Sequence, residues 1–326
     1  MLWRQSVESL MDEGYQRLEM GDYERALKIG RQLLKRHHTS GFEIAARAQW
    51  EMGHQEEAIK TLEEGVQVAP EVWILWSYLG QFYSDTERYE QALHAFRHAL
   101  TCPEAAQSTA HYNLALVYYR QGDYERAWRQ LDYVADEEDG PGYGRVAGLR
   151  LRLLNAMERY TEALALAREA LERAQSEETD DAALASLYAE RADACWRGAA
   201  DRVQALTDAW QAIRLDKNQQ TAMLVIREIE QQTSPRTQWY RLLVEGEWHE
   251  PVEGAEPPLG FYTTYWVAAD SPEEAMDFIR RFEPEPVRPT LRLVESEALE
   301  HRPDLLKGVY GATKYAFFPM KRQRKK

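Results

Sequence analysis

The segment W-S-Y-L-G-Q-F-Y at residues 76–83 decides the fold, together with A-L-H-A-F at residues 92–96. The first part has the spacing W-x2-L-G-x2-Y, and the second part has the spacing A-x3-F after a short polar turn. Each spacing is typical of one helix in a repeated helix–turn–helix unit. Because one such unit cannot bury its own apolar face, the pattern predicts further units stacked on it.

Neighbouring units are visible along the chain. The sequence G-D-Y-E-R-A occurs at residues 21–26 and again at residues 122–127, with degenerate copies between and after them. Glycine suits a turn that needs a positive φ, and the acidic residues favour the positive N-terminal end of the following helix. The small residue that allows two helices to approach closely recurs at Ala26, Ala58, Ala92, Ala127, Ala163 and Ala205.

These repeats resemble the tetratricopeptide (TPR) family over residues 7–217. The resemblance implies a right-handed α-solenoid of about six helix–turn–helix repeats, and residues 219–232 read as one further amphipathic helix that caps the last repeat. We therefore expect a helical domain over residues 1–235. The fold class expected for the whole chain is mostly α, with a small α+β domain at residues 236–320 and a basic tail at 321–326.

Composition and charge limit the cellular compartment and the kind of partner that we expect. No apolar run approaches the ~20 residues of a membrane span, and two cysteines cannot form a disulfide framework. We therefore expect a cytoplasmic protein. The first 235 residues hold 26 basic and 39 acidic side chains, whereas residues 236–326 are nearly balanced. An acidic solenoid argues against nucleic acid as a partner and tolerates basic proteins. Plain solubility is an equally good explanation of the charge.

Beyond Ser234-Pro235 the period changes from that of a helix to that of strands. Residues 239–245, 261–269, 290–294 and 313–318 are predicted strands, and residues 249–260 form a loop rich in proline and glycine. A helix opens at Ser271-Pro272 with a capping box completed by Glu274. Residues 303–306 are a candidate short helix. The order β-β-α-β-(α)-β suggests a ferredoxin-like α+β domain.

The second predicted strand carries aromatic residues on both faces. Phe261, Thr263, Tyr265 and Val267 would share one side, and Tyr262, Thr264, Trp266 and Ala268 the other. An exposed ring set would dock on the last repeat or on a partner. A possible small-molecule pocket in this domain would involve Trp248, Tyr262 and Trp266.

Motifs for catalysis are missing from the sequence. It contains no phosphate-binding P-loop, no dinucleotide-binding glycine motif and no nucleophile elbow. His94 and His98 have a metal-compatible spacing, but no carboxylate or cysteine completes a site, so we read them as a solvated helix face. We expect no catalytic residues, no metal and no cofactor.

The TPR resemblance nominates a groove for a protein or peptide partner. In that family the first helix of each repeat lines a concave surface. The positions that match here are Arg47, Trp50, Ser77, Gln81, Tyr112, Asn113, Leu116, Tyr119, Arg120, Arg152 and Asn155. Asparagine can both donate to and accept from a peptide backbone, and rings and arginines are efficient anchors. Packing against adjacent helices is an equally good reading for Tyr112 and Leu116.

Three functions remain open from the sequence. The leading hypothesis is a non-enzymatic adaptor or scaffold that binds a protein or peptide in the groove. The alternative is a ligand-sensing regulator whose α+β domain binds a small molecule and whose solenoid relays it. A third is an enzyme centred on the C-terminal domain, which would need a strongly perturbed carboxylate or histidine in a pocket. The oligomeric state stays open.

Overall fold

The computed structural model describes residues 6–134, 142–176, 179–252 and 258–320. The chain divides into two compact units, residues 1–146 and 147–326. The basic tail and residues 253–257 of the predicted 249–260 loop lie outside the described residues. A domain boundary near residue 235 remains a prediction.

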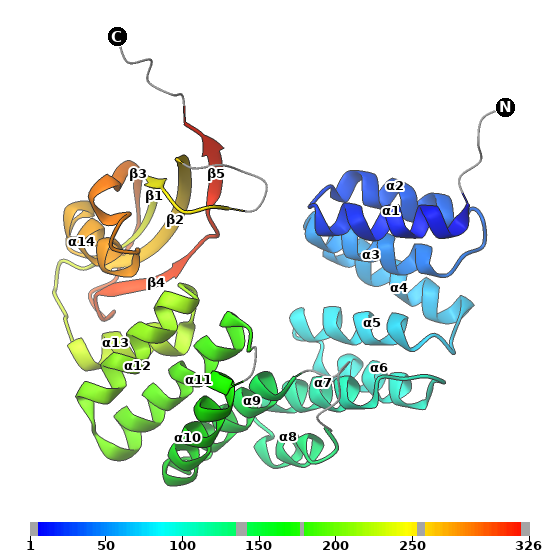
Figure 1. The fold of residues 1–326 in the computed structure, drawn as a ribbon, viewed down its shortest axis with the longest axis horizontal. Coiled ribbons are helices and arrows are strands. Elements are labelled where there is room, and N and C mark those ends of the chain that lie inside the picture. Colours follow the sequence, from blue (N-terminus) through cyan, green and yellow to red (C-terminus); the bar gives the residue numbers. More distant parts are fainter. Residues whose placement is uncertain (1–5, 135–141, 177–178, 253–257, 321–326) are drawn as a thin grey trace. The chain divides into compact units, whose positions relative to one another are not determined.

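The first unit is a stack of helical hairpins (Figure 1). Consecutive helices pair through short turns, and each pair packs on the next, as the sequence repeats predict. The helices are α1 (Val7–Glu19), α2 (Tyr23–Leu34), α3 (Ser40–Glu51), α4 (Gln55–Val68), α5 (Trp73–Asp85), α6 (Tyr89–Thr101), α7 (Gln107–Arg120) and α8 (Tyr124–Leu131).

Small residues set the spacing within the hairpins. All six repeat alanines are fully buried, at 0% exposure, so each allows the close helix contact that the sequence predicts. Gly80 lies so close to the ring of Phe96 that a Cβ atom there would approach it to 2.9 Å. Side-chain contact between two helices of one hairpin therefore explains the glycine of the W-x2-L-G-x2-Y pattern.

The second unit continues the helical hairpins and adds a sheet. Its helices are α9 (Tyr143–Ala156), α10 (Tyr160–Ser176), α11 (Asp181–Ala194), α12 (Arg202–Leu215) and α13 (Gln220–Glu230). A single π-helical turn, Cys195–Ala199, follows α11. The predicted terminal helix is α13, and its residues Met223, Ile226 and Ile229 are buried as expected.

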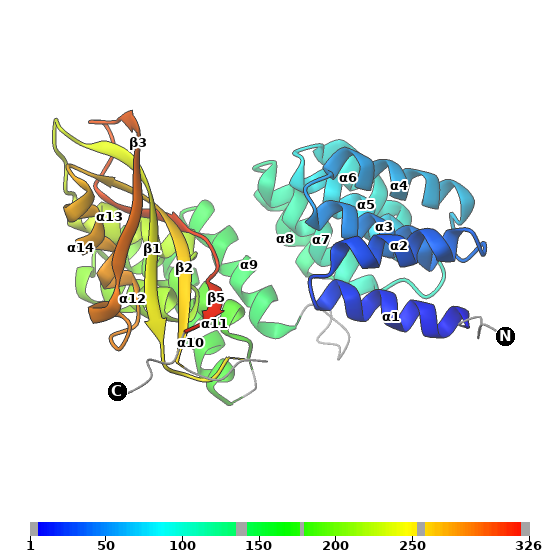
Figure 2. The same cartoon turned by 90° about the horizontal axis from the view of Figure 1, so that it is seen from above.

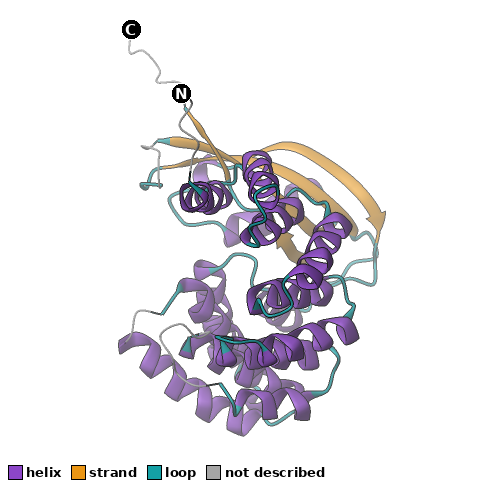
Figure 3. Ribbon diagram, turned by 90° about the vertical axis from the view of Figure 1, so that its right-hand side faces the viewer, coloured by secondary structure: helices purple, strands orange, loops and turns teal. Residues whose placement is uncertain are grey.

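The sheet is antiparallel throughout, with the strand order β3-β1-β2-β4. Figure 2 shows β3, β1 and β2 side by side in that order. A short fifth strand pairs with the beginning of β2, and helix α14 packs on the sheet. Figure 3 shows the strands as one curved layer. The elements are β1 (Gln238–Trp248), β2 (Leu259–Ala269), α14 (Pro272–Phe282), a 3-10 turn (Arg288–Thr290), β3 (Arg292–His301), β4 (Gly308–Ala312) and β5 (Ala316–Pro319).

One hydrophobic core joins the last helices to the sheet. Met223 and Ile226 of α13, Tyr265 of β2 and Ile279 of α14 belong to the same buried cluster. The predicted alternation along β2 is confirmed for the rings, since Phe261 and Tyr265 are buried while Tyr262 and Trp266 point to the other face. The ring set that meets the last repeat is thus the buried one.

Several expectations for the C-terminal domain are wrong. Residues 303–306 form a turn, in which Asp304 accepts hydrogen bonds from the Arg302 guanidinium. The third strand is longer than residues 290–294 and begins at Arg292. The ferredoxin-like arrangement is also wrong, because it needs a second helix and a parallel strand pair, and the described sheet has neither.

The predicted strand at 313–318 is correct only for its second half: residues 313–315 connect β4 to β5, and residues 316–318 belong to β5. Thr313 donates its backbone N–H to the carbonyl of Thr264, and Tyr315 turns to the core side to reach Glu283. β4 was missed because its sequence, G-V-Y-G-A, contains two glycines, which strands disfavour.

Candidate partner-binding surfaces

A hollow of about 440 Å³ lies on the first unit, on the face made by α3 and α5. Three of the predicted groove residues line it: Arg47, Trp50 and Gln81. Arg47 and Trp50 lie one turn apart on the first helix of repeat two, and Gln81 lies on the first helix of repeat three. Sequence reasoning missed its other members. The lining, called the α3–α5 patch below, is Leu18, Tyr23, Arg47, Trp50, Glu51, Tyr78, Gln81 and Phe82.

Aromatic stacking fixes the shape of the α3–α5 patch. The rings of Trp50 and Phe82 are stacked with centroids 4.0 Å apart and planes 10° apart. The guanidinium of Arg47 lies 5.2 Å from the centroid of the Tyr78 ring. Burial raises the pKa of Tyr78, so this phenol stays neutral beside Arg47. The patch therefore offers a preformed aromatic surface.

A buried carboxylate orients Arg47. Glu43 is only 7% exposed, and its Oε1 lies 3.1 Å from a terminal nitrogen of Arg47. Its other oxygen accepts a hydrogen bond of 2.8 Å from Tyr15 on α1. Because the carboxylate holds one side of the guanidinium, the arginine is half-exposed in a defined orientation.

The predicted groove residues on α7 are of mixed character. Arg120 is tied to the preceding repeat, donating to Ser84 Oγ at 2.6 Å and to Asp85 Oδ1 at 2.8 Å. Within the described chain, the half-buried side-chain amide of Asn113 has no hydrogen-bond partner, so it is free to pair with a peptide backbone. The remaining predicted positions, Ser77, Tyr112, Leu116 and Tyr119, are half-buried.

The two predicted groove residues in the second unit hold helices together. Arg152 Nε lies 3.0 Å from Glu190 Oε1, and the Asn155 amide donates to the Glu190 carbonyl at 2.9 Å. Burial raises the pKa of Glu190, and the pairing with Arg152 opposes that shift. Because Asn155 is itself buried, these contacts stabilise the packing of α9 on α11.

The second unit contains its own cavity, of about 1190 Å³, where α12, α14 and β5 meet. Trp248 lines it, as predicted, but Tyr262 and Trp266 lie on the opposite face of the sheet. The structure therefore does not bring the three predicted pocket residues together. This junction cavity is lined mainly by rings and charges, among them Trp210, Arg214, Trp248, Arg288, Lys314, Tyr315 and Phe317.

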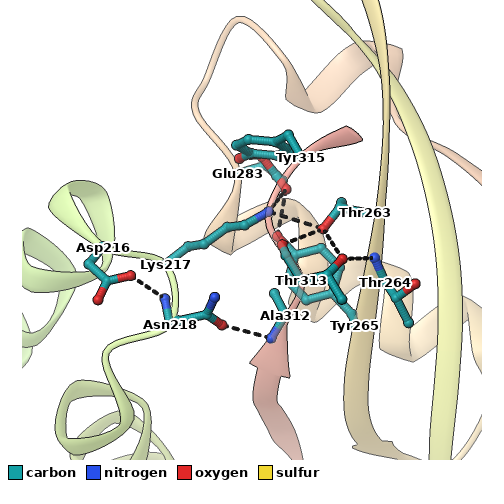
Figure 4. Close-up of polar contacts among 10 residues, drawn as sticks. All are labelled: Asp216, Lys217, Asn218, Thr263, Thr264, Tyr265, Glu283, Ala312, Thr313 and Tyr315. Atoms are coloured by element: carbon teal, nitrogen blue, oxygen red, sulfur yellow. Dashed lines mark hydrogen bonds and ion pairs between the residues drawn. The ribbon is translucent and has the colours of Figure 1, made fainter. Parts of the chain in front are cut away.

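Lys217 lies beside this cavity and joins the α12–α13 turn to the sheet (Figure 4). Its Nζ is 3.1 Å from Thr263 Oγ1 and 3.8 Å from Glu283 Oε1. The ammonium also lies 3.4 Å from the centroid of the Tyr315 ring. Burial lowers the pKa of Lys217 to about 8, although Glu283 opposes this shift.

Both carboxylate oxygens of Glu283 have hydrogen-bond partners in this cluster. Glu283 is fully buried and accepts hydrogen bonds of 2.5 Å from the hydroxyls of Tyr265 and Tyr315. Beside it, Asn218 Oδ1 accepts a bond of 2.9 Å from the backbone N–H of Ala312 (Figure 4). The ammonium of Lys217 thus contacts Thr263, Glu283 and the Tyr315 ring, and we call this cluster the Lys217–Glu283 clasp because it joins the α12–α13 turn to the sheet. No sequence motif pointed to it.

Within residues 6–134, 142–176, 179–252 and 258–320, no group of three or more His, Cys, Asp or Glu side chains is placed to hold a metal ion. In the same ranges, none of the helices combines the length and apolar character needed to cross a bilayer. His98 instead stacks on Trp76, with centroids 4.6 Å apart.

Comparison with known proteins agrees with the helical repeats. A tetratricopeptide repeat model matches residues 44–109, 83–143 and 112–178, and a model described as anaphase-promoting complex subunit 5 matches residues 13–72. No protein of curated function matches the chain in sequence.

Two solved structures show the same fold. One is the APC/C hetero-tetramer Cut9-Hcn1, with a TM-score of 0.57 and 13% identity, over 71% of this chain and 44% of that one. This chain thus spans less than half of that relative. The other is a tetratricopeptide repeat protein from Parabacteroides merdae, with a TM-score of 0.55, 16% identity and coverage of 69% and 86%. Residues 44–178 therefore consist of tetratricopeptide repeats, and the helical part of the chain has the fold of tetratricopeptide repeat proteins.

Proposed function

We propose that the chain is a non-enzymatic adaptor that binds a segment of a partner protein on the α3–α5 patch. The observation that carries this proposal is the preformed stack of the half-exposed Trp50 ring on the buried Phe82 ring, beside the oriented guanidinium of Arg47. Interfaces draw most of their affinity from such rings and arginines. The cytoplasmic setting expected from the cysteine content is part of the same proposal.

The shape of the patch indicates how a partner would bind. The hollow of about 440 Å³, which Arg47 and Glu51 line together with Trp50, has room for one side chain of a partner beside the Trp50 ring. Gln81, which is exposed at the rim, can donate to and accept from the adjoining peptide backbone. Since Trp50 already stacks on a neighbour, little side-chain entropy is lost when a partner docks.

The test starts from peptides selected on the intact protein by display. Trp50→Ala should weaken the selected peptide at least tenfold, because truncating an anchor ring commonly costs more than ~1.4 kcal/mol. Lys60→Ala, an exposed position on the neighbouring helix α4, is the control and should leave binding unchanged. Equal affinity of the Trp50→Ala protein, with its fold shown intact by circular dichroism, would refute the patch.

The junction cavity supports a second candidate function, the binding of a small molecule by the second unit. Its volume is ample for a metabolite, and its lining combines the rings of Trp248 and Phe317 with the exposed cations Arg214 and Lys314. The carboxylates of Asp181, Glu250 and Glu285 also line the cavity, so a planar anion would bind on the side of Arg214 and Lys314. A thermal-shift screen of aromatic carboxylates and nucleotides tests this, with Lys314→Ala expected to abolish any shift. Stabilisation that survives Lys314→Ala and Phe317→Ala together would reject the cavity.

A further inference from the structure

The outer edge of the sheet is open for pairing. β3 is an edge strand of the sheet, and all ten of its residues are exposed. Leu293, Val294 and Leu299 are 38%, 48% and 45% exposed, which is unusual for aliphatic side chains in a strand. An unpaired edge of this kind presents free backbone N–H and C=O groups to another chain.

Two bulges define how much of this edge is regular. The neighbours Leu243 and Val244 of β1 pair with Glu295 and Leu293, so Val294 of β3 has no partner in β1. Likewise, Trp239 and Tyr240 pair with Glu300 and Ala298, so Leu299 has none. Between these bulges, residues 295–298 keep regular register with β1. An incoming strand would therefore pair over these four residues.

The regular stretch carries a charge pattern. Glu295 and Glu297 lie opposite Leu243 and Arg241 on the outer face of the sheet, and they line a hollow of about 250 Å³ with Trp266. Glu297 forms an ion pair of 2.6 Å with Arg241, whereas Glu295 has no ion pair within the described chain. Ser296 and Ala298 point to the other face.

The charges decide which chain this edge accepts. Antiparallel pairing with a second copy, centred on residue 295, 296 or 297, places a glutamate opposite a glutamate, which is destabilising. A strand with basic residues at two alternate positions would instead place a cation opposite each carboxylate. Opposite charges across a strand pair contribute roughly 0.2–1 kcal/mol each. The same carboxylates thus exclude self-pairing and select a basic strand.

We propose that β3 accepts an extended basic segment of a partner protein as an added strand. The segment carries lysine or arginine at two positions separated by one residue, above Glu295 and Glu297, and small or apolar residues between them. Backbone hydrogen bonds to residues 295–298 would give affinity, and the two ion pairs would give selectivity. This surface belongs to the second unit and is independent of the α3–α5 patch.

The probe is a fluorescein-labelled peptide of alternating lysine and valine, added to the intact protein. We expect saturable binding by fluorescence anisotropy. Glu295→Gln/Glu297→Gln should weaken it at least tenfold, and Glu285→Gln/Glu250→Gln, at exposed acids elsewhere in the unit, should not. The same peptide with N-methylated alternate amides keeps its charge but cannot pair as a strand, so it should bind at least tenfold more weakly.

A charge reversal makes the test independent of any loss of folding. Glu295→Lys/Glu297→Lys should lose the lysine peptide and gain a peptide of alternating glutamate and valine. Hydrogen exchange should show the protection by peptide concentrated in residues 293–299. Equal binding by the Gln variant, equal binding of the N-methylated peptide, or protection elsewhere would overturn the proposal. A peptide-free dimer protected at β3 would replace the basic strand with a second copy.

Discussion

At the scale of single residues, the turns between paired helices show one backbone requirement met in two ways. Gly21, Gly53 and Gly122 adopt left-handed φ values of 73°, 81° and 78°. Glu87 and Glu158 occupy the equivalent turns with φ values of 61° and 57°, although they carry a Cβ atom. Glycine adopts this conformation without the steric cost that other residues bear, so the third and fifth repeats have strained turns.

This difference predicts opposite effects of exchanging the residues. Glu87→Gly should stabilise the first unit by roughly 0.5–1 kcal/mol, because it removes the left-handed strain, and Gly122→Ala should destabilise it by about as much. Urea unfolding followed by circular dichroism measures both. A loss of stability in Glu87→Gly would contradict this account of the turn.

Lys217 gives a pH-dependent prediction. Its folded pKa of about 8 is below the ordinary lysine pKa of 10.5, so the unfolded chain binds more protons between these two pH values. Stability therefore rises with pH through this window. Relative to Lys217→Met, the wild-type protein should gain about 2 kcal/mol of unfolding free energy between pH 7.5 and 10.

The measurement for Lys217 is urea unfolding at both pH values. Lys60→Met, at an exposed helix position, is the control and should follow the wild-type pH dependence. A constant difference between the wild type and Lys217→Met would show that the buried ammonium does not titrate as described.

At the scale of secondary-structure elements, the junction of α13 with β4 depends on one arginine. Arg227 is only 7% exposed, donates to the Val309 carbonyl and lies 3.7 Å from the centroid of the Tyr310 ring. Burial lowers the pKa of this guanidinium, while Tyr310 opposes the shift. The helix thus anchors the sheet edge through a desolvated cation.

Removing that anchor should loosen β4 selectively. Arg227→Ala should cost roughly 2–4 kcal/mol, because it leaves a buried carbonyl unpaired and removes a cation–π contact. Hydrogen exchange at residues 308–312 should rise most. Arg280→Ala, on the exposed side of α14, should change stability by less than ~0.5 kcal/mol. Uniform loosening of the whole unit would argue against a local anchor.

The sequence was a good guide to the helices and a partial guide to the sheet. Periodic patterns such as the buried alanines and the Gly80–Phe96 contact arise within one hairpin, so local spacing reveals them. The Lys217–Glu283 clasp joins residues far apart in the chain, and no local pattern encodes it. The same limit applies to the pocket: Trp248 was predicted, but residues of α12 and α14 that complete the cavity were not.

At the scale of the whole molecule, the sheet and the last helices share one hydrophobic core. The shared core contains residues of α11, α12, α13, the sheet and α14. Cutting the chain near residue 235 would expose Met223 and Ile226 on one piece and Tyr265 and Val267 on the other. Exposing these apolar side chains to water would destabilise both pieces, because a small domain has little other hydrophobic core to offset the loss.

Two fragments test whether the sheet can fold without the last helices. Residues 147–326 should fold alone with a cooperative thermal transition, whereas residues 236–326 should not. Differential scanning calorimetry distinguishes the two outcomes. Cooperative unfolding of residues 236–326 alone would instead favour an independent domain, as the sequence first suggested.

The central claim is that a partner binds on the α3–α5 patch. Hydrogen exchange of the intact chain, with and without a display-selected peptide, tests it most directly. The account predicts slowed exchange in residues 44–52 and 76–84, and none of that slowing in the Trp50→Ala protein at the same peptide concentration. Protection confined to the second helices of the repeats, or to the second unit, would contradict it.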